Sequence, residues 1–142
     1  MSHLSLELRA RQADRMIAAS AVLVHLCSET DWARARFDGE LRPPSLDEVG
    51  FVHLSAPEQV HLPANRLYRG QSGLVLLVLD PDLLGSPVRW EPGVPTDPAS
   101  MLFPHLYGPL PAASVVRTVP YRPADDGVFA ALPANFGADR GG

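Results

Sequence analysis

An unbroken aliphatic run over residues 74–79, bounded by Gly73 and Asp80, is the clearest pattern along the chain. Successive side chains of a strand point to opposite faces, and every position in this run is apolar. We therefore expect a strand that is buried on both faces and lies in the middle of a sheet. Shorter runs of β-forming residues predict four further strands, at 21–27, 51–54, 88–91 and 114–121.

Helical patterns are fewer. Residues 3–19 have an amphipathic pattern that predicts an appended helix. A short helix is expected from Ser28 or Thr30, as N-cap, to about Asp38, with Gly39 as its end. Residues 57–69 predict a helix that Pro63 kinks or divides, because proline removes an internal hydrogen bond. The prolines and polar residues of 41–49 and 92–99 predict loops.

The length of 142 residues favours a single folded domain. We expect an appended N-terminal helix over 1–20, the domain itself over 21–123 and a C-terminal tail over 124–142.

Composition excludes some functions. A formal net charge of -4 argues against non-specific nucleic-acid binding, which needs a basic face. No apolar run approaches the roughly 18 residues of a membrane span, so no membrane partner is expected. The single Cys27 is compatible with a reducing compartment, and we expect a cytoplasmic protein. The oligomeric state is not indicated.

His53 lies at the end of the predicted strand 51–54 and is the first candidate for chemistry. Its side chain can donate, accept or carry a proton near neutral pH. Ser55 is expected to cap the helix that follows, with Pro57 and Glu58 in the first turn. The site would then combine a titratable ring with a helix N-terminus, where ligands are often held. The alternative is a core histidine whose nitrogens bind backbone groups.

A second unusual stretch covers residues 101–111. If this segment is extended, His105 and Tyr107 project to the same face, because side chains alternate along a strand. The predicted strand 88–91 carries Arg89 and Glu91 on one face and Val88 and Trp90 on the other. His25, in the strand 21–27, is interpreted as a structural residue, although it can also point into a cleft.

No metal signature, glycine-rich phosphate loop or serine-nucleophile motif occurs in the sequence. We therefore take His53, His105 and Glu91 as candidate catalytic residues. The candidate ligand-binding residues are Ser55, Asn65, Arg66 and Tyr107. If these groups converge, they can hold an anion, stack on a flat ring and bind a sugar hydroxyl, as a nucleotide requires. A carboxylate near a ribose can also stabilise positive charge when a C–N glycosidic bond breaks.

Several segments together resemble the DUF952 family of small bacterial proteins. They are Gly50 to Ser55, Ala64-Asn65-Arg66, the strand at 74–80, Arg89-Trp90-Glu91 and Phe103-Pro104-His105-Leu106-Tyr107-Gly108-Pro109-Leu110. The resemblance covers about residues 22–121. It implies an α+β fold of the ADP-ribosyltransferase type, in which two small mixed β-sheets face each other across a cleft with short flanking helices.

That fold is shared by NAD-consuming transferases and tRNA 2′-phosphotransferases. The resemblance implies that a polar residue on an early strand grips a ribose of the nucleotide, and His53 matches that position. The sequence departs from the transferases because no middle-strand tyrosine or serine is evident. The late segment offers His105 and Tyr107 rather than a plain catalytic glutamate, and Glu91 is the nearest carboxylate.

Three functions stay open. The first is an NAD-dependent enzyme acting at the ribose by ADP-ribosyl or phosphoryl transfer, in which His53 orients the ribose and Arg66 holds a phosphate. His105 or Glu91 would then steady the developing positive charge, and Tyr107 would stack on a ring of the ligand. The second is a non-catalytic module that binds a nucleotide or another small ligand. The third is an accessory protein in which the histidines and Trp90 only stabilise the core.

Overall fold

A computed structural model describes residues 22–93, 101–133 and 136 of the chain. The helix expected over 3–19 lies outside the described residues, as does most of the loop expected over 92–99.

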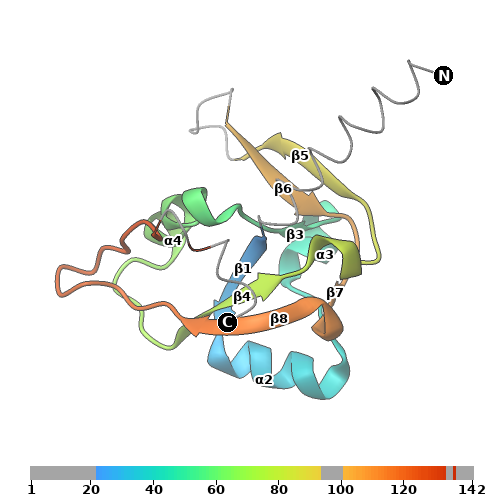
Figure 1. Cartoon of the computed structure of the whole chain (residues 1–142), viewed down its shortest axis with the longest axis horizontal. Coiled ribbons are helices and arrows are strands. Elements are labelled where there is room, and N and C mark those ends of the chain that lie inside the picture. The colour runs from blue at the N-terminus through green and yellow to red at the C-terminus, as the bar shows by residue number, and fades with distance from the viewer. Residues whose placement is uncertain (1–21, 94–100, 134–135, 137–142) are drawn as a thin grey trace, which may run out of the picture.

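The aliphatic run forms β4 (Leu74–Leu79), the middle strand of a three-stranded sheet (Figure 1). β1 (Leu23–Ser28) and β8 (Val115–Pro120) pair with it on either side, both antiparallel. All six residues of β4 are buried. The prediction of a central strand covered on both faces is confirmed.

A second three-stranded sheet has the order β3 (Val52–His53), β6 (Leu102–Leu106) and β5 (Val88–Pro92). A two-stranded ribbon pairs β2 (Glu40–Leu41) with β7 (Leu110–Pro111). An isolated bridge joins the two larger sheets, because the backbone N–H and C=O of Val24 bind the C=O and N–H of Ser55 at 2.8 and 2.9 Å.

The α+β class is confirmed. The expectation of mixed sheets is wrong for the part of the chain that the structure describes, because every strand pair there is antiparallel.

Local capping explains α2 (Glu29–Asp38), which confirms the predicted helix. The hydroxyl of Ser28 accepts a hydrogen bond from the backbone N–H of Asp31 at 3.0 Å, as an N-cap does. Gly39 ends the helix at φ 87°, a conformation that costs glycine little. In Figure 1 the helix lies at the opposite end of the view from β5 and β6.

The loop expected over 41–49 is wrong, because α3 (Pro44–Val49) lies within it. Two consecutive prolines suggest a loop, yet proline is well tolerated at the first position of a helix, where its missing N–H has no intrahelical partner. Pro43 is the N-cap residue and Gly50 ends the helix at φ 88°.

The helix expected over 57–69 is divided, but not at Pro63. A single 3₁₀ turn, η1 (Pro57–Gln59), is followed by α4 (His61–Leu67). Pro63 falls in the first turn of α4, where backbone N–H groups lack intrahelical acceptors. The prediction that Ser55 is an N-cap is also wrong: η1 begins after Ala56, whose N–H donates to the side-chain carbonyl of Gln59 at 2.9 Å. Two further 3₁₀ turns are η2 (Pro81–Leu83) and η3 (Ala112–Ser114).

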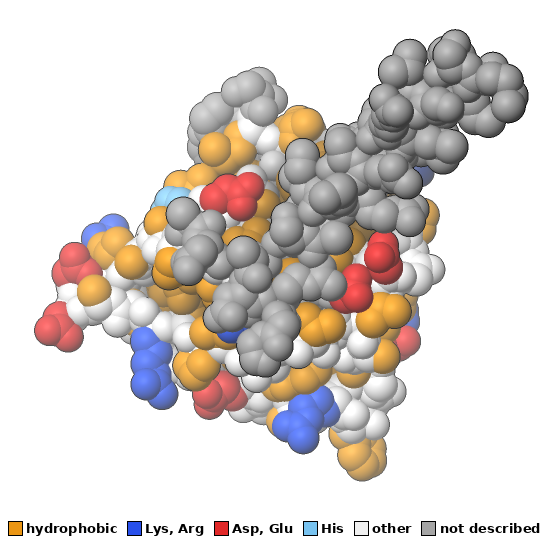
Figure 2. Space-filling view, in the orientation of Figure 1, with side chains coloured by type: hydrophobic (Ala, Val, Ile, Leu, Met, Phe, Trp, Pro, Cys, Tyr) orange, Lys and Arg blue, Asp and Glu red, His pale blue; other side chains and the backbone are white. Residues whose placement is uncertain are grey.

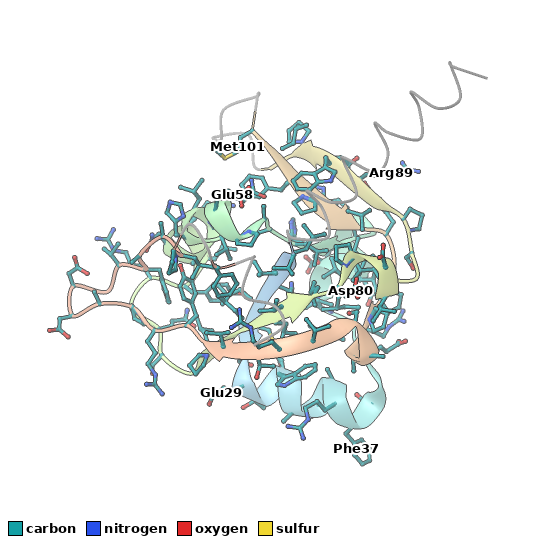
Figure 3. All side chains as sticks on the ribbon, in the orientation of Figure 1. Glu29, Phe37, Glu58, Asp80, Arg89 and Met101 are labelled. Carbon is teal, nitrogen blue, oxygen red and sulfur yellow. The ribbon has the colours of Figure 1, made fainter. Side chains whose placement is uncertain are left out.

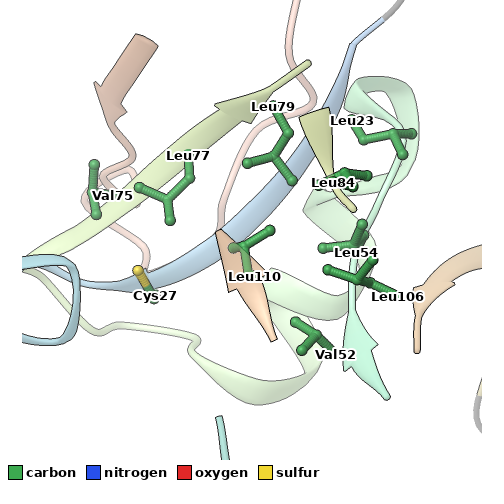
Figure 4. Packing of buried hydrophobic residues seen from close by; sticks show 10 residues of the cluster. All are labelled: Leu23, Cys27, Val52, Leu54, Val75, Leu77, Leu79, Leu84, Leu106 and Leu110. Atoms are coloured by element: carbon green, nitrogen blue, oxygen red, sulfur yellow. The ribbon is translucent and has the colours of Figure 1, made fainter. Parts of the chain in front are cut away.

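Buried side chains form two clusters on opposite faces of β4. The first cluster joins residues of both three-stranded sheets and of the β2–β7 ribbon (Figure 4). Its buried members are Leu23, Cys27, Val52, Leu54, Val75, Leu77, Leu79, Leu84, Leu106 and Leu110. The second cluster is Val22, Val24, Val60, Ala64, Leu74, Leu76, Val78, Tyr121 and Phe129. The alternation along β4 therefore divides the core between its two faces.

The segment after β8 contributes to this second cluster, since Phe129 is only 1% exposed. The side-chain amide of Asn65 binds the backbone of Phe129 through both its nitrogen and its oxygen. The NH₂ donates to the Phe129 carbonyl at 3.0 Å, and the Phe129 N–H donates to the side-chain oxygen at 2.7 Å. The first part of the expected tail is thus attached to α4.

The surface carries charges of both signs. On the face shown in Figure 2, arginines and acidic side chains are scattered and do not form a single basic patch. Phe37, at the last turn of α2, projects into solvent with 91% of its surface exposed (Figure 3). Among the described residues, none of the helices is both long and apolar enough to span a bilayer.

Candidate functional site

His53 and His105 meet because β3 pairs with β6. In that antiparallel register His53 lies opposite His105, which in turn lies opposite Arg89 of β5. Residues opposite each other on neighbouring strands share a face, and so do residues two apart along one strand. One face of the sheet therefore carries Phe51, His53, His105, Tyr107, Arg89 and Glu91. The other face, with Val52 and Leu106, packs into the first core cluster.

Glu91 joins two members of this face by hydrogen bonds. Its Oε1 accepts from the hydroxyl of Tyr107 at 2.6 Å and lies 2.9 Å from Nδ1 of His105. These two hydrogen bonds, with that of Tyr107 the larger effect, lower the pKa of Glu91. The same contact raises the pKa of Tyr107, because the hydroxyl proton is bound to a carboxylate. Arg89 lies over the Tyr107 ring, 4.9 Å from its centre.

The ring of Phe51 contacts the rings of His53, His105 and Tyr107. It stacks on His105 with ring centres 4.0 Å apart and planes 11° from parallel. Its ring also lies 5.0 Å from that of His53 and 5.3 Å from that of Tyr107. The His53 and His105 rings are 5.4 Å apart and nearly perpendicular. We call these residues, Phe51, His53, Glu91, His105 and Tyr107, the ring cluster.

His105 is buried in this cluster, with 3% of its surface exposed. Its Nδ1 faces Glu91, while Nε2 is buried and has no hydrogen-bond partner among the described residues. A carboxylate bound to one nitrogen of an imidazole orients the ring and selects its tautomer. The proton on Nδ1 leaves Nε2 as an acceptor in the neutral ring.

A cavity of about 730 Å³ lies beside the ring cluster. Its lining residues come from β1, α2, the β2–α3 segment, β3 and α4. His53 and Ser55 line it, whereas Glu91, His105 and Tyr107 do not. Among the ring cluster, His53 is therefore the residue that also borders the cavity.

His53 is exposed on β3, unlike its buried neighbour Val52. Its pKa is lowered, first by partial burial and then by the nearby His105 and Arg66. The ring is thus biased toward its neutral form, which can both donate and accept. Arg66 does not line the cavity, although its positive charge contributes to the lowered pKa of His53.

His25 lines the cavity from β1. Its Nδ1 lies 2.7 Å from the backbone carbonyl of His53, and burial lowers its pKa to about 4. Two other cavity-lining groups are also biased toward their neutral forms. Burial raises the pKa of the Cys27 thiol to about 12 and raises the pKa of the Tyr68 hydroxyl.

The structure therefore brings five of the seven predicted site residues to one region. His53, His105, Glu91 and Tyr107 form the ring cluster with Phe51, and Ser55 lines the adjoining cavity. Arg66 is not brought to the cavity lining, although its charge contributes to the lowered pKa of His53. Asn65, by contrast, uses both ends of its amide to bind Phe129 and has a structural role.

Sequence reasoning took His25 as structural, with a position in a cleft as the alternative, and missed Tyr68 and Phe51 as site residues. A polar ring between Val24 and Leu26 in a strand was a signal for His25, because a buried histidine must find partners. Tyr68 and Phe51 had no comparable signal, since aromatic residues at these spacings are usually core residues. No group of three or more potential metal ligands occurs within the described ranges.

Comparisons with known proteins point to a family whose function is not established. A family model described as "Protein of unknown function (DUF952)" matches residues 26–118. No curated protein matches the chain.

Solved structures of protein CC0527 from Caulobacter crescentus are similar. An X-ray structure is 32% identical with a TM-score of 0.66, over 77% of this chain and 93% of that one. A solution NMR structure is 34% identical with a TM-score of 0.62, over 75% of this chain and 90% of that one.

Proposed function

The chain belongs to the DUF952 family, and we propose that it is a nucleotide-binding protein that takes NAD or a related nucleotide into the cavity and acts at the ribose. The observation that carries this proposal is the position of His53. It borders the cavity on one side and contacts the ring cluster on the other. A ligand seated in the cavity can thus present one of its groups to the histidine and carboxylate chemistry.

The cavity suits a ligand of this size and composition. Its volume falls within the range of roughly 300–1,000 Å³ that is typical of small-molecule sites. A neutral His53 can donate to one ribose hydroxyl and accept from the other, and Arg66, whose charge contributes to the lowered pKa of His53, would supply positive charge for a phosphate. The proposal includes an ADP-ribosyltransferase-like fold, in which the two three-stranded sheets border the nucleotide. It also includes a cytoplasmic location, where NAD is available.

The chemistry proposed is cleavage of the C–N glycosidic bond at the ribose. Nicotinamide leaves with the bonding electron pair, and the anomeric carbon becomes an oxocarbenium ion. An acceptor hydroxyl or water then adds to that carbon and releases its proton to a base. Glu91, held ionised by Tyr107 and His105, supplies negative charge near the developing cation. The ribose has to lie over the ring cluster for this step, because Glu91 does not line the cavity.

Calorimetric titration with NAD tests the binding. We expect heat from the wild type and at least a tenfold weaker affinity for His53→Ala, because leaving a ligand hydroxyl without its hydrogen-bonding partner costs about 1–3 kcal/mol. His61→Ala is the matched control, because His61 lies on α4 outside the cavity lining. Absence of heat at millimolar NAD, or equal heats from wild type and His53→Ala, would overturn the proposal.

One observation favours a second candidate, a binding module without catalysis. Glu91 Oε1 already accepts two hydrogen bonds, and neither Glu91 nor His105 borders the cavity. Chromatographic detection of nicotinamide separates the two functions. Release that stops in Glu91→Gln, with NAD binding retained, identifies the enzyme. Tight, His53-dependent binding without any release identifies the module.

A further inference from the structure

His25 presents one defined atom to the cavity. A carbonyl oxygen only accepts hydrogen bonds, so the 2.7 Å contact with the His53 carbonyl requires the proton on Nδ1. In the neutral ring Nε2 is then an acceptor. Burial keeps the ring neutral by lowering its pKa to about 4. The hydrogen bond to the His53 carbonyl raises the pKa, but by less than burial lowers it. The charged or titratable groups that influence this ring are His53 and Asp31.

Nε2 of His25 is open to a ligand. The described residues form no hydrogen bond to this nitrogen. It is also not fully buried, unlike the unpartnered nitrogens Nδ1 of His61, Nε2 of His105 and Nε of Arg117. Since His25 lines the cavity, its accessible nitrogen faces that space. An acceptor in this position calls for a donor on the ligand.

The cavity has an uncharged inner end and a charged rim. We call the buried part of the lining the inner end; its residues carry no charge at neutral pH and are His25, Cys27, Ser55, Val60 and Leu74. The rim carries exposed charged side chains, namely Asp31, Arg34, Asp38 and Arg42. Phosphates would lose their hydration at the inner end without gaining a cation, whereas the rim offers water and Arg34; Arg42, also at the rim, is paired with Glu40 at 2.9 Å.

We propose that the inner end of the cavity binds an uncharged nucleobase whose exocyclic amino group donates a hydrogen bond to Nε2 of His25, with the phosphates toward the rim. This inference rests on the proposed function and specifies how its ligand is oriented. The inner end holds an aminated base such as adenine and not the cationic nicotinamide ring. In NAD this base is adenine, and the phosphates at the rim separate it from the nicotinamide-side ribose, which is the ribose that the proposed function places at His53 and the ring cluster.

The test compares adenosine 5′-monophosphate with purine riboside 5′-monophosphate, which lacks only the amino group. We expect the wild type to bind the aminated probe about 3- to 10-fold more tightly, the usual effect of one neutral hydrogen bond. His25→Asn should reduce that ratio to about one. An asparagine amide nitrogen reaches roughly the position of Nδ1, so this variant keeps the donor to the His53 carbonyl and removes Nε2. His61→Asn is the matched control and should keep the wild-type ratio.

A measurement on the wild type alone avoids any effect of the variant on folding. The ¹⁵N resonance of Nε2 in His25 should move on addition of the aminated probe and move less with its analogue. Equal affinities for the two probes, or an unmoved Nε2 resonance, would overturn this inference. If NAD still binds in a His53-dependent way, the proposed function survives that result; if neither probe nor NAD binds, both proposals fail.

Discussion

At His25, the backbone carbonyl of His53 determines which ring nitrogen carries the proton. The hydrogen bond from Nδ1 to the His53 carbonyl fixes the tautomer, and burial opposes protonation. Glu91 acts similarly on His105, but with a carboxylate in place of a carbonyl. The two histidines thus carry the same proton arrangement through different partners, and only His25 is open to the cavity.

The depressed pKa of His25 predicts a loss of stability in mild acid. The unfolded chain binds this proton near pH 6.5, while the folded chain binds it near pH 4. Stability is therefore complete above about pH 6.5 and declines as the pH falls toward about 4, by a total on the order of 3 kcal/mol. Urea denaturation across this range measures it, and the lowered pKa of His53 acts in the same direction.

His25→Asn isolates the contribution of this residue, because the variant cannot take up the proton. Between about pH 6.5 and pH 4, the free energy of unfolding of the variant should fall by on the order of 3 kcal/mol less than that of the wild type. A pH dependence as steep in the variant as in the wild type would show that another group is responsible.

At the scale of single elements, α4 connects the cavity to the C-terminal segment. Pro63 and Leu67 of this helix line the cavity, and Asn65 binds the backbone of Phe129. Phe129 in turn packs against Tyr121, with ring centres 4.9 Å apart. The segment after β8 therefore supports one wall of the cavity from behind.

Asn65→Ala is expected to destabilise the protein by about 1–3 kcal/mol, because two backbone groups of Phe129 lose their partner. Amide hydrogen exchange at Phe129 should become faster, and urea denaturation should give the free energy. Asn65→Asp is the matched control: it keeps the acceptor for the Phe129 N–H and lacks the donor, so its effect on exchange should be smaller. Unchanged exchange in Asn65→Ala would mean that the segment is held by packing alone.

For the whole molecule, the first core cluster makes the sheets a single cooperative unit. Leu77 of β4, Val52 of β3 and Leu106 of β6 belong to this cluster, although they come from two different sheets. The Val24–Ser55 bridge adds a backbone connection between those sheets. We expect the described domain to unfold in one transition.

Leu77→Ala should lower the free energy of unfolding by about 2–5 kcal/mol, since Leu77 is fully buried and the change leaves a cavity. Trp32 on α2 and Trp90 on β5 can report the transition separately in the variants Trp90→Phe and Trp32→Phe. Both fluorescence signals should give the same midpoint and shift together when Leu77 is replaced. Separate midpoints would contradict a common core, and Phe37→Ala, at an exposed site, should change stability little.

Local signals in the sequence were sufficient for some elements. The aliphatic run of β4 predicted a buried central strand because apolar residues at every position have no polar face to expose. Ser28 and Gly39 marked the ends of α2 because their backbone and hydrogen-bonding preferences act within one turn. The helix α3 and the start of α4 were missed because Pro43, Pro44 and Pro63 stop a helix or start one depending on their position in it.

The sequence by itself determined the central strand and the presence of polar rings on strands, since these follow from alternation and local preference, while the α+β class followed from the resemblance to a family. Only the tertiary structure decided that Glu91 meets His105 and Tyr107, that Asn65 turns away to Phe129, and that His25 faces the cavity. Those contacts depend on strand register and on pairing between distant segments, where a shift of one residue exchanges the two faces of a strand. That information lies in the packing of the whole chain and not in any short stretch of it.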